Sequence, residues 1–537
     1  MGNVLSGNYT YGTTSADLGN LGKLEGVLID GRVKRFLNVP YALPPTGEYR
    51  WKRPRALPED YCYSEGETPF NATKFGRPCP QPNYTSLPVA ETAGEGKKTF
   101  PFDEDCLRMN IWLPSGPAPE SGFSTYVWLH GGWFQIGDPS IDPKMDPTEL
   151  ITTGGLNCIF ISVGYRLGAL GFLASKELLE ESGDGSVGNY GLWDQRACLE
   201  WVHKNITKLG GNPQKVVLGG RSAGSYATHA HLVHDTLLAK PTEGGLFQRA
   251  IMISNAIPCL PKQLSEVQEQ FEQLLTALSI PLTLSGPEKL ARLRQVSAEV
   301  LMEKVMTIEQ YTFRQVQDGV FFRNKTWLYD GKVAEEFKKR GMAVYMGECM
   351  DEETLYRSTF DFSDENSIRK ACVQYYTTDE VRYVLQSPDP DPEINEYAKV
   401  FGDIASDCQV RAPSRSFARQ LREAGVPLEN VNRYIVGWVP QVVVDFSPKK
   451  FGVTHAMDRP IHNFSIMHGP TPKEEKLMKE WITDYANFVN WRPMNFGTTK
   501  WEEVKVLSSK HGGSILIEED RKWGYLEKVS AIMEDRE

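Results

Sequence analysis

The sequence contains a serine flanked by glycines, in the run Gly-Arg-Ser-Ala-Gly at residues 220–224. An apolar run, 216–218, precedes it, and a stretch that favours a helix, 225–238, follows it. A serine on a sharp turn between a strand and a helix exposes its hydroxyl, and the glycines leave room for a crowded backbone. The start of the helix adds N–H groups that stabilise a negative oxygen. The pattern therefore favours Ser222 as a nucleophile over an ordinary tight turn with a serine at the helix N-cap.

A serine nucleophile requires a base, and the best placed of the nine histidines is His455. It lies in a predicted turn, 452–458, after the last predicted strand. A loop beyond the carboxyl end of a strand can reach a site at that edge of the sheet. His229, His231 and His234 fall on the helix after the serine, where we expect them to point away from the site, to lie at the surface and to bind no metal.

The segment 347–353 supplies the candidates for a carboxylate that orients the histidine. It carries four acidic residues and follows a predicted strand, 343–346. Such a cluster is typical of a solvated loop, and the alternative is that one of these acids turns inward towards His455. The order serine, acid, histidine along the chain is the one expected of α/β-hydrolases.

Residues 128–133, Trp-Leu-His-Gly-Gly-Trp, are candidates for stabilising the negative oxygen of a reaction intermediate. Adjacent glycines at the end of a strand allow unhindered N–H groups to face one point. Gly131 and Gly132, together with the N–H of Ala223, would form such an oxyanion hole. The alternative is a simple glycine turn.

Short apolar runs rich in β-forming residues recur along the chain, separated by helical segments or long loops. They lie at 126–129, 159–163, 216–218, 250–254, 343–346 and 434–438. This alternation predicts an α/β protein with a central, mostly parallel sheet covered by helices on both faces. The last strong helix is predicted at 472–490, with a capping box formed by Thr471 and Glu474.

The domain organisation predicted from the sequence is simple. We expect a flexible leader at 1–23 and a single catalytic domain at 24–537 with large insertions, the largest at about 258–330. The formal charge of −10 is spread along the 537 residues without a block of Lys and Arg, which argues against a nucleic-acid partner. No apolar stretch is long enough for a transmembrane segment.

Signals for the cellular compartment conflict. The N-terminal residues lack the apolar core of a secretory signal, so we expect a cytoplasmic protein. Residues 1–6 fit the myristoylation pattern at Gly2, which would allow membrane association. Secretion remains the alternative, because six glycosylation sequons occur, at Asn8, Asn71, Asn83, Asn205, Asn324 and Asn463.

Several further motifs carry a resemblance to a known family. They are the segments 36–42 (Phe-Leu-Asn-Val-Pro-Tyr-Ala), 104–111 (Glu-Asp-Cys-Leu-Arg-Met-Asn-Ile) and 189–196 (Asn-Tyr-Gly-Leu-Trp-Asp-Gln-Arg), followed by Gly-Gly-Asn-Pro at 210–213 and the serine motif. In this order, from about residue 24 to residue 491, the chain resembles the type-B carboxylesterase/lipase family, the cholinesterase-like branch of the α/β-hydrolases. The resemblance implies the α/β-hydrolase fold.

The resemblance also assigns roles to individual positions. It implies Ser222 as nucleophile, Glu352 as the acid and His455 as the general base, with oxyanion donors at Gly131, Gly132 and Ala223 and the N–H of Trp133 as a further candidate. It implies a disulfide between Cys79 and Cys106, which a reducing cytosol would oppose, and an ion pair between Arg50 and Glu104.

Four positions depart from the family pattern. Arg221 replaces a glutamate beside the nucleophile, and Trp133, Glu353 and Asn255 each replace a glycine. We expect the indole of Trp133 to narrow the acyl or alcohol pocket. We also expect Arg221 and Glu353 to form an ion pair, because both depart from the pattern near one site.

These features predict a serine-dependent hydrolase of carboxylic esters that acts through an acyl-enzyme intermediate, on a small-molecule ester and without a cofactor. One alternative is acyl transfer, lactone or thioester chemistry in a biosynthetic pathway. Another is a non-catalytic, adhesion-type relative on the same fold. The sequence leaves the acyl and alcohol groups and the oligomeric state open.

Overall fold

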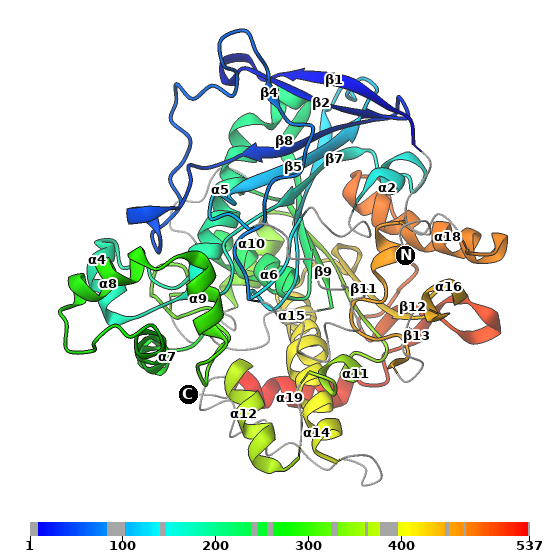
Figure 1. Cartoon of the computed structure of the whole chain (residues 1–537). Helices are drawn as coiled ribbons and strands as arrows, with labels where there is room; N and C mark the ends of the chain where they lie inside the picture. The colour runs from blue at the N-terminus through cyan, green and yellow to red at the C-terminus, as the bar shows by residue number, and fades with distance from the viewer. Residues whose placement is uncertain are drawn as a thin grey trace.

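One large sheet runs through the protein in a computed structural model (Figure 1). The structure describes residues 9–82, 102–139, 146–237, 245–254, 261–323, 331–359, 363–375, 396–445, 451–465 and 469–534. The strands are β1 (Tyr11–Asp17), β2 (Lys23–Ile29), β3 (Val33–Pro40), β4 (Phe70–Asn71), β5 (Arg108–Pro114), β6 (Phe123–Leu129), β7 (Cys158–Val163), β8 (Gly211–Arg221), β9 (Arg249–Ile253), β10 (Ala343–Cys349), β11 (Val431–Gly437), β12 (Glu503–Ser508) and β13 (Ser514–Glu519).

The strands lie in the order β1-β2-β3-β5-β7-β6-β8-β9-β10-β11-β12-β13, with β4 beside β2. The central strands from β7 to β12 pair in parallel, and the flanking pairs on either side are antiparallel. Each of the six predicted apolar runs coincides with one of the strands β6 to β11 to within a few residues at each end. The predicted α/β architecture with a mostly parallel sheet is therefore confirmed.

Helices cover both faces of this sheet (Figure 1). They are α2 (Thr148–Thr152), α3 (Gly168–Phe172), α4 (Lys176–Ser182), α5 (Tyr190–Asn205), α6 (Ala223–Thr236), α7 (Leu264–Ala277), α8 (Gly286–Gln295), α9 (Ala298–Val305), α10 (Lys332–Lys339), α11 (Glu353–Tyr356), α12 (Glu365–Tyr375), α14 (Glu396–Ser406), α15 (Ala412–Glu423), α16 (Gln441–Asp445), α17 (Arg459–His462), α18 (Pro472–Val489) and α19 (Trp523–Glu534). The segment between β9 and β10 contains α7 to α10, and α7, α8 and α9 gather with α4 at one side of the molecule.

Successive side chains of a strand point to opposite faces of the sheet, so the core forms two clusters, one on each face. On β6, Val127 and Leu129 face the cluster that contains residues of α5 and α6, whereas Tyr126 and Trp128 face the cluster that contains α18. The apolar side chains of α18, among them Trp481 and Tyr485, are buried in this second cluster, and the helix begins with the predicted capping box. Each central strand is thus buried on both faces, as a parallel sheet requires.

The prediction of a flexible leader at 1–23 is wrong for its second half. Residues 11–17 form β1, which pairs antiparallel with β2, and Leu18 and Leu21 are buried in the core. A strand at the sheet edge needs only one partner for its backbone hydrogen bonds, and the polar sequence did not reveal it. The myristoylation pattern at Gly2 lies outside the described residues.

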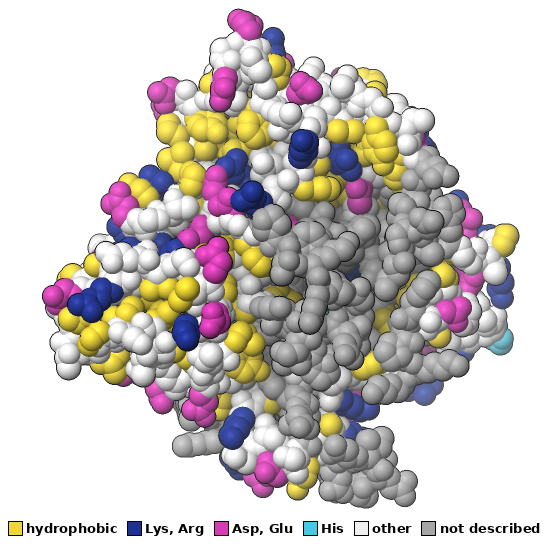
Figure 2. All heavy atoms as spheres, viewed as in Figure 1, with side chains coloured by type: hydrophobic (Ala, Val, Ile, Leu, Met, Phe, Trp, Pro, Cys, Tyr) yellow, Lys and Arg dark blue, Asp and Glu magenta, His cyan; other side chains and the backbone are white. Residues whose placement is uncertain are grey.

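The surface carries charges of both signs. Lys and Arg alternate with Asp and Glu over the face that Figure 2 shows. Two of the sequons are not surface sites, because Asn205 and Asn463 are buried, whereas Asn71 is exposed. Among the described helices, none has the combined length and apolar character of a membrane span.

The histidines of α6 are buried, contrary to the prediction that they lie at the surface. Every residue of this helix is buried, because it packs between the sheet and other helices. Burial lowers the pKa of His229 to about 3 and that of His234 to about 4, so both rings are neutral. His231 Nε2 lies 3.0 Å from Gln195 Oε1, and His234 Nδ1 lies 3.0 Å from the carbonyl oxygen of Phe321. These are contacts of core histidines, and no metal-binding cluster occurs within the described ranges.

Candidate active site

The predicted nucleophile lies on the turn between β8 and α6. Ser222 has φ 56° and ψ −124°, a backbone conformation that residues other than glycine rarely adopt. Its N–H donates to the carbonyl oxygen of Ile253 at 2.9 Å, and its own carbonyl accepts from Tyr226 N at 2.9 Å. The neighbouring strand and the helix thus hold the serine in a strained conformation with its side chain partly exposed.

The flanking glycines are required by close backbone contacts. A Cβ at Gly220 would lie 2.4 Å from the carbonyl carbon of Gly224, and a Cβ at Gly224 would lie 2.0 Å from the carbonyl oxygen of Leu129. Neither position has room for a larger residue. The crowding predicted from the glycine pattern is therefore present.

The loop after β6 lies against this turn. A Cβ at Gly131 would lie 2.7 Å from the carbonyl oxygen of Arg221 and 3.0 Å from Ser222 Cβ. Gly132 and Trp133 follow with positive φ, 113° and 54°. In the described part of the chain, the N–H groups at 131–133 donate to no backbone carbonyl.

His130 fixes the start of this loop. Its ring stacks on Tyr165 with 4.4 Å between centroids, and its carbonyl oxygen accepts from the Tyr165 hydroxyl at 2.8 Å. Burial lowers the pKa of His130 to about 4, so the ring is neutral and serves as a packing group.

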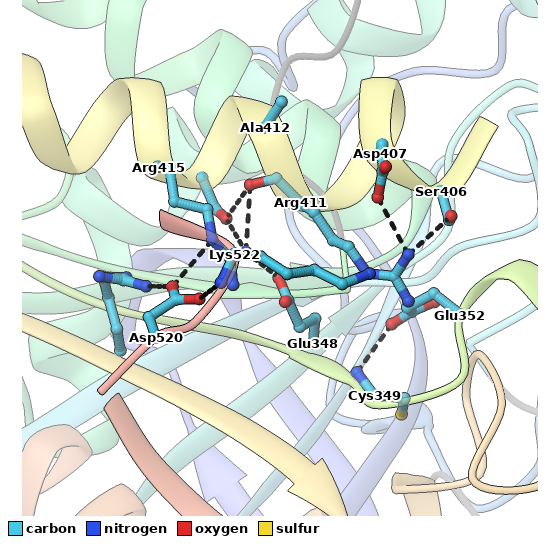
Figure 3. A network of polar contacts seen from close by, with 12 residues as sticks. Glu348, Cys349, Glu352, Ser406, Asp407, Arg411, Ala412, Arg415, Asp520 and Lys522 are labelled. Atoms are coloured by element: carbon cyan, nitrogen blue, oxygen red, sulfur yellow. Dashed lines mark hydrogen bonds and ion pairs between the residues drawn. The ribbon is translucent and has the colours of Figure 1, made fainter. Parts of the chain in front are cut away.

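The predicted acid and base are in direct contact. Glu352 is fully buried, and its Oε2 lies 2.5 Å from His455 Nδ1. The other oxygen, Oε1, accepts from the N–H of Cys349 at 2.8 Å (Figure 3). Of the four acids in this segment, Glu352 is thus the one that turns towards the histidine. This contact orients the imidazole and leaves Nε2 as the nitrogen that can accept a proton.

A second contact joins the loops that carry these two residues. Asp351 Oδ2 accepts from Val453 N at 2.8 Å, and Asp351 N donates to the carbonyl oxygen of Val453 at 3.1 Å. The segment 350–352, which carries Glu352 (the acid loop), and the segment 452–458, which carries His455 (the histidine loop), therefore run side by side.

The predicted ion pair between Arg221 and Glu353 is wrong. Arg221 pairs with Asp458, and Glu353 pairs with Arg411 at 2.5 Å. The two side chains belong to different environments. Arg221 lies among buried tyrosines such as Tyr434, whereas Glu353 begins α11, close to the π-helical turn that carries Arg411.

An arginine network behind the acid loop was missed by the sequence analysis (Figure 3). Arg415 on α15 contacts Glu348 at 2.5 Å and Asp520, after β13, at 3.0 Å. Arg411 Nη2 also donates to the carbonyl oxygen of Met350 at 3.0 Å. Burial acts to raise the pKa of Glu353, but the charge and hydrogen bond of Arg411 outweigh it, so this carboxyl stays ionised. The only feature of the sequence that could have indicated this network is the spacing of Arg411 and Arg415, which lie one helical turn apart.

Trp133 lies at the edge of a third apolar cluster. This cluster contains Tyr356 of α11, Phe401 of α14 and residues of α12, and the half-buried Trp133 packs against it. The ring of Tyr356 lies 6.0 Å from that of His455. The indole of this loop residue thus packs against a cluster that borders the histidine. The fourth departure, Asn255, lies outside the described residues.

The resemblance also implies an ion pair between Arg50 and Glu104 and a disulfide between Cys79 and Cys106. Arg50 Nε donates to Glu104 Oε2 at 2.8 Å, so the expected ion pair is present. Cys79 and Cys106 are both buried and close enough for the Cys79 thiol to help raise the pKa of Cys106. The disulfide between them stays a prediction.

Comparison with known proteins decides the family. A sequence model of the carboxylesterase family matches residues 14–531. The chain belongs to the carboxylesterase family. An uncharacterised esterase/lipase of Schizosaccharomyces pombe is 34% identical over 95% of this chain and 94% of its own length. A carboxylic ester hydrolase of Gibberella moniliformis is 32% identical over 96% of this chain and 95% of its own length.

A more distant relative matches only in part. The mouse cholinesterase is 34% identical over 44% of this chain and 36% of its own length. The family match and the full-length relatives make this carboxylesterase family member a carboxylic ester hydrolase of the serine esterase type.

The contact between Gly131 and the serine turn predicts a strong effect of one added methyl group. Gly131→Ala places a Cβ 2.7 Å from the Arg221 carbonyl oxygen, which must push the glycine loop at 131–133 away from the serine. We expect kcat/KM for a p-nitrophenyl ester to fall by about 10²-fold, the scale of a 1 Å misplacement. Gly116→Ala is the control, because its Cβ would meet nothing within 4 Å. Equal rates for the two variants would contradict the packing described.

Proposed function

We propose that Ser222 is the nucleophile of this ester hydrolase, that His455 is its general base, and that Glu352 orients the imidazole. The observation that supports these roles best is the buried hydrogen bond between Glu352 and His455. The strained turn at Ser222 and the glycine loop packed against it add the two other parts that acyl transfer requires.

In the proposed acylation step, Nε2 of His455 takes the proton of Ser222 as Oγ bonds to the ester carbonyl carbon. The C=O electron pair moves onto the oxygen. When it returns, the bond to the alcohol breaks and the alcohol takes the proton from His455. Water then attacks the acyl-enzyme in the same way and releases the carboxylic acid. Glu352 stabilises the imidazolium in both steps.

The negative oxygen of each intermediate is proposed to accept hydrogen bonds from Gly131, Gly132 and Ala223, with Trp133 as a fourth donor. Ala223 begins α6, so its N–H points from the positive end of the helix dipole. Each such donor is worth about 10²–10³ in turnover. The segment 131–133 packs against the serine turn, and the helix start follows Ser222 directly, which allows several donors to converge.

We further propose that Trp133 limits the acyl or alcohol group of the substrate. Its indole fills space between the oxyanion loop and the cluster around Tyr356. A smaller residue at this position leaves that space to the ester.

Ser222→Ala tests the proposed nucleophile. The variant should form no acyl-enzyme, so we expect neither a burst of p-nitrophenol nor labelling by a fluorophosphonate probe. Ser509→Ala, an exposed serine in a turn, is the matched control and should label like the unmodified protein. Labelling of Ser222→Ala to the same extent would refute the assignment.

Trp133→Gly tests the proposed limit on substrate size. We expect the ratio of kcat/KM for a long-chain to a short-chain p-nitrophenyl ester to rise roughly tenfold or more, since pocket contacts of one methylene are worth about 10–200-fold. Trp501→Gly makes the same change at another half-buried tryptophan in a turn and should leave the ratio unchanged. A constant ratio in Trp133→Gly would place the indole outside the substrate pocket.

A further inference from the structure

A buried ion pair joins the segments that carry the serine and the histidine. Arg221, the residue before Ser222, pairs with Asp458, which lies three residues after His455. The side chains are 5% and 0% exposed. Because breaking one partner of a buried pair leaves an uncompensated charge, this contact resists separation of the two segments.

Asp458 has a second role as the anchor of the histidine loop. Its Oδ2 accepts from His462 Nδ1 at 2.9 Å, and its carbonyl oxygen accepts from the N–H of His462 at 3.0 Å, at the start of α17. Burial acts to raise the pKa of Asp458, but the charge of Arg221 and the hydrogen bond from His462 outweigh it and hold the pKa well below its usual value. The carboxylate therefore stays ionised and fixed.

Titratable groups from neighbouring elements lie close to this pair, and one of them, His462, is in contact with Asp458. The Cys349 thiol and the Tyr434 hydroxyl both lie close enough to Arg221 and Asp458 for their charges to act on them. Burial raises the pKa of each well above its usual value, so both are neutral. Tyr485, further along the same face, is neutral for the same reason. The charge of Glu352 also acts on Cys349.

The histidine is thus held from both sides. Asp351 binds Val453, two residues before His455, and Arg221 binds Asp458, three residues after it. The first contact links the histidine loop to the acid, and the second links it to the serine turn. A glutamate at 221, which the resemblance leads us to expect, would face the Asp458 carboxylate and repel it.

We propose that Arg221 and Asp458 are a positioning pair that sets the distance and angle between His455 and Ser222. This proposal rests on the proposed roles of Ser222 and His455. Neither Arg221 nor Asp458 reacts. Their effect is to hold the imidazole where it can take the serine proton, which is the geometric condition for general-base catalysis.

A double-mutant cycle tests the pair. Arg221→Met, Asp458→Asn and the double variant are compared by kcat/KM for p-nitrophenyl acetate, per active site counted by complete fluorophosphonate labelling. We expect each single variant to lose about 10²-fold and the double variant to lose no more than the poorer single one, because both remove the same contact. Counting sites corrects for protein that fails to fold.

Two further measurements separate positioning from stability. In Arg221→Met the unpaired Asp458 carboxylate favours protonated His455, so the acid limb of kcat/KM moves to higher pH. In Asp458→Asn the unpaired guanidinium moves the acid limb to lower pH.

Two other variants complete the test. Arg221→Lys, which keeps the charge, should fold and lose less activity than Arg221→Met. Arg340→Met, which breaks a remote ion pair with Asp235, should lower stability and leave kcat/KM per site unchanged.

The proposal is overturned if Arg221→Met keeps kcat/KM per site within about threefold of the unmodified protein, a difference in activation free energy below ~0.7 kcal/mol. If Arg221→Met does not fold, the same criterion applies to Arg221→Lys and Asp458→Asn. Additive losses in the double variant would overturn it as well. A failure of the proposed function is distinguishable, since the unmodified protein would then not label at Ser222.

Discussion

A buried carboxylate is the constraint on which the site depends. A carboxylate with no exposure to water is stable only when its oxygens are hydrogen-bonded, and Glu352 meets this condition with His455 Nδ1 on one oxygen and Cys349 N on the other. Cys349 is the last residue of β10, and the segment that carries His455 comes after β11 and α16 in the chain. Strands β10 and β11 are neighbours and run parallel. Satisfying the buried charge therefore also fixes the orientation of the imidazole. The contact that satisfies the buried carboxylate is therefore also the contact that orients His455.

The parallel sheet explains why distant residues can meet. Strands β6, β8, β10 and β11 end at the same edge, and the glycine loop at 131–133, the turn at Ser222, the acid loop and the histidine loop follow them in turn. Close backbone packing joins the first two, through Gly131 and Gly224. Ion pairs and hydrogen bonds join the others, through Asp351 and Asp458. Strain at Ser222 persists because these contacts surround it.

Much of this arrangement could be predicted from the sequence, and the failures have physical reasons. The central strands and α18 follow from hydrophobic patterning, and the serine turn from its glycines. Glu352 could be chosen among four nearby acids only through the family resemblance, because spacing does not show which acid turns inward. The histidines of α6 were misplaced because a helix buried on all sides shows no polar face. The partners of Arg221 and Glu353 depend on which side of the sheet each side chain enters, and Asp458 and Arg411 come from remote segments.

The most direct test of the site is a crystal structure of the protein after reaction with a fluorophosphonate, whose phosphorus mimics the tetrahedral carbon. The predicted result is a bond from phosphorus to Ser222 Oγ, with the phosphoryl oxygen about 2.7–3.1 Å from N–H groups of the loop after β6 and of Ala223, and with His455 Nε2 facing the adduct. Phosphorus bound to another side chain, or a phosphoryl oxygen turned to solvent with His455 directed elsewhere, would contradict it.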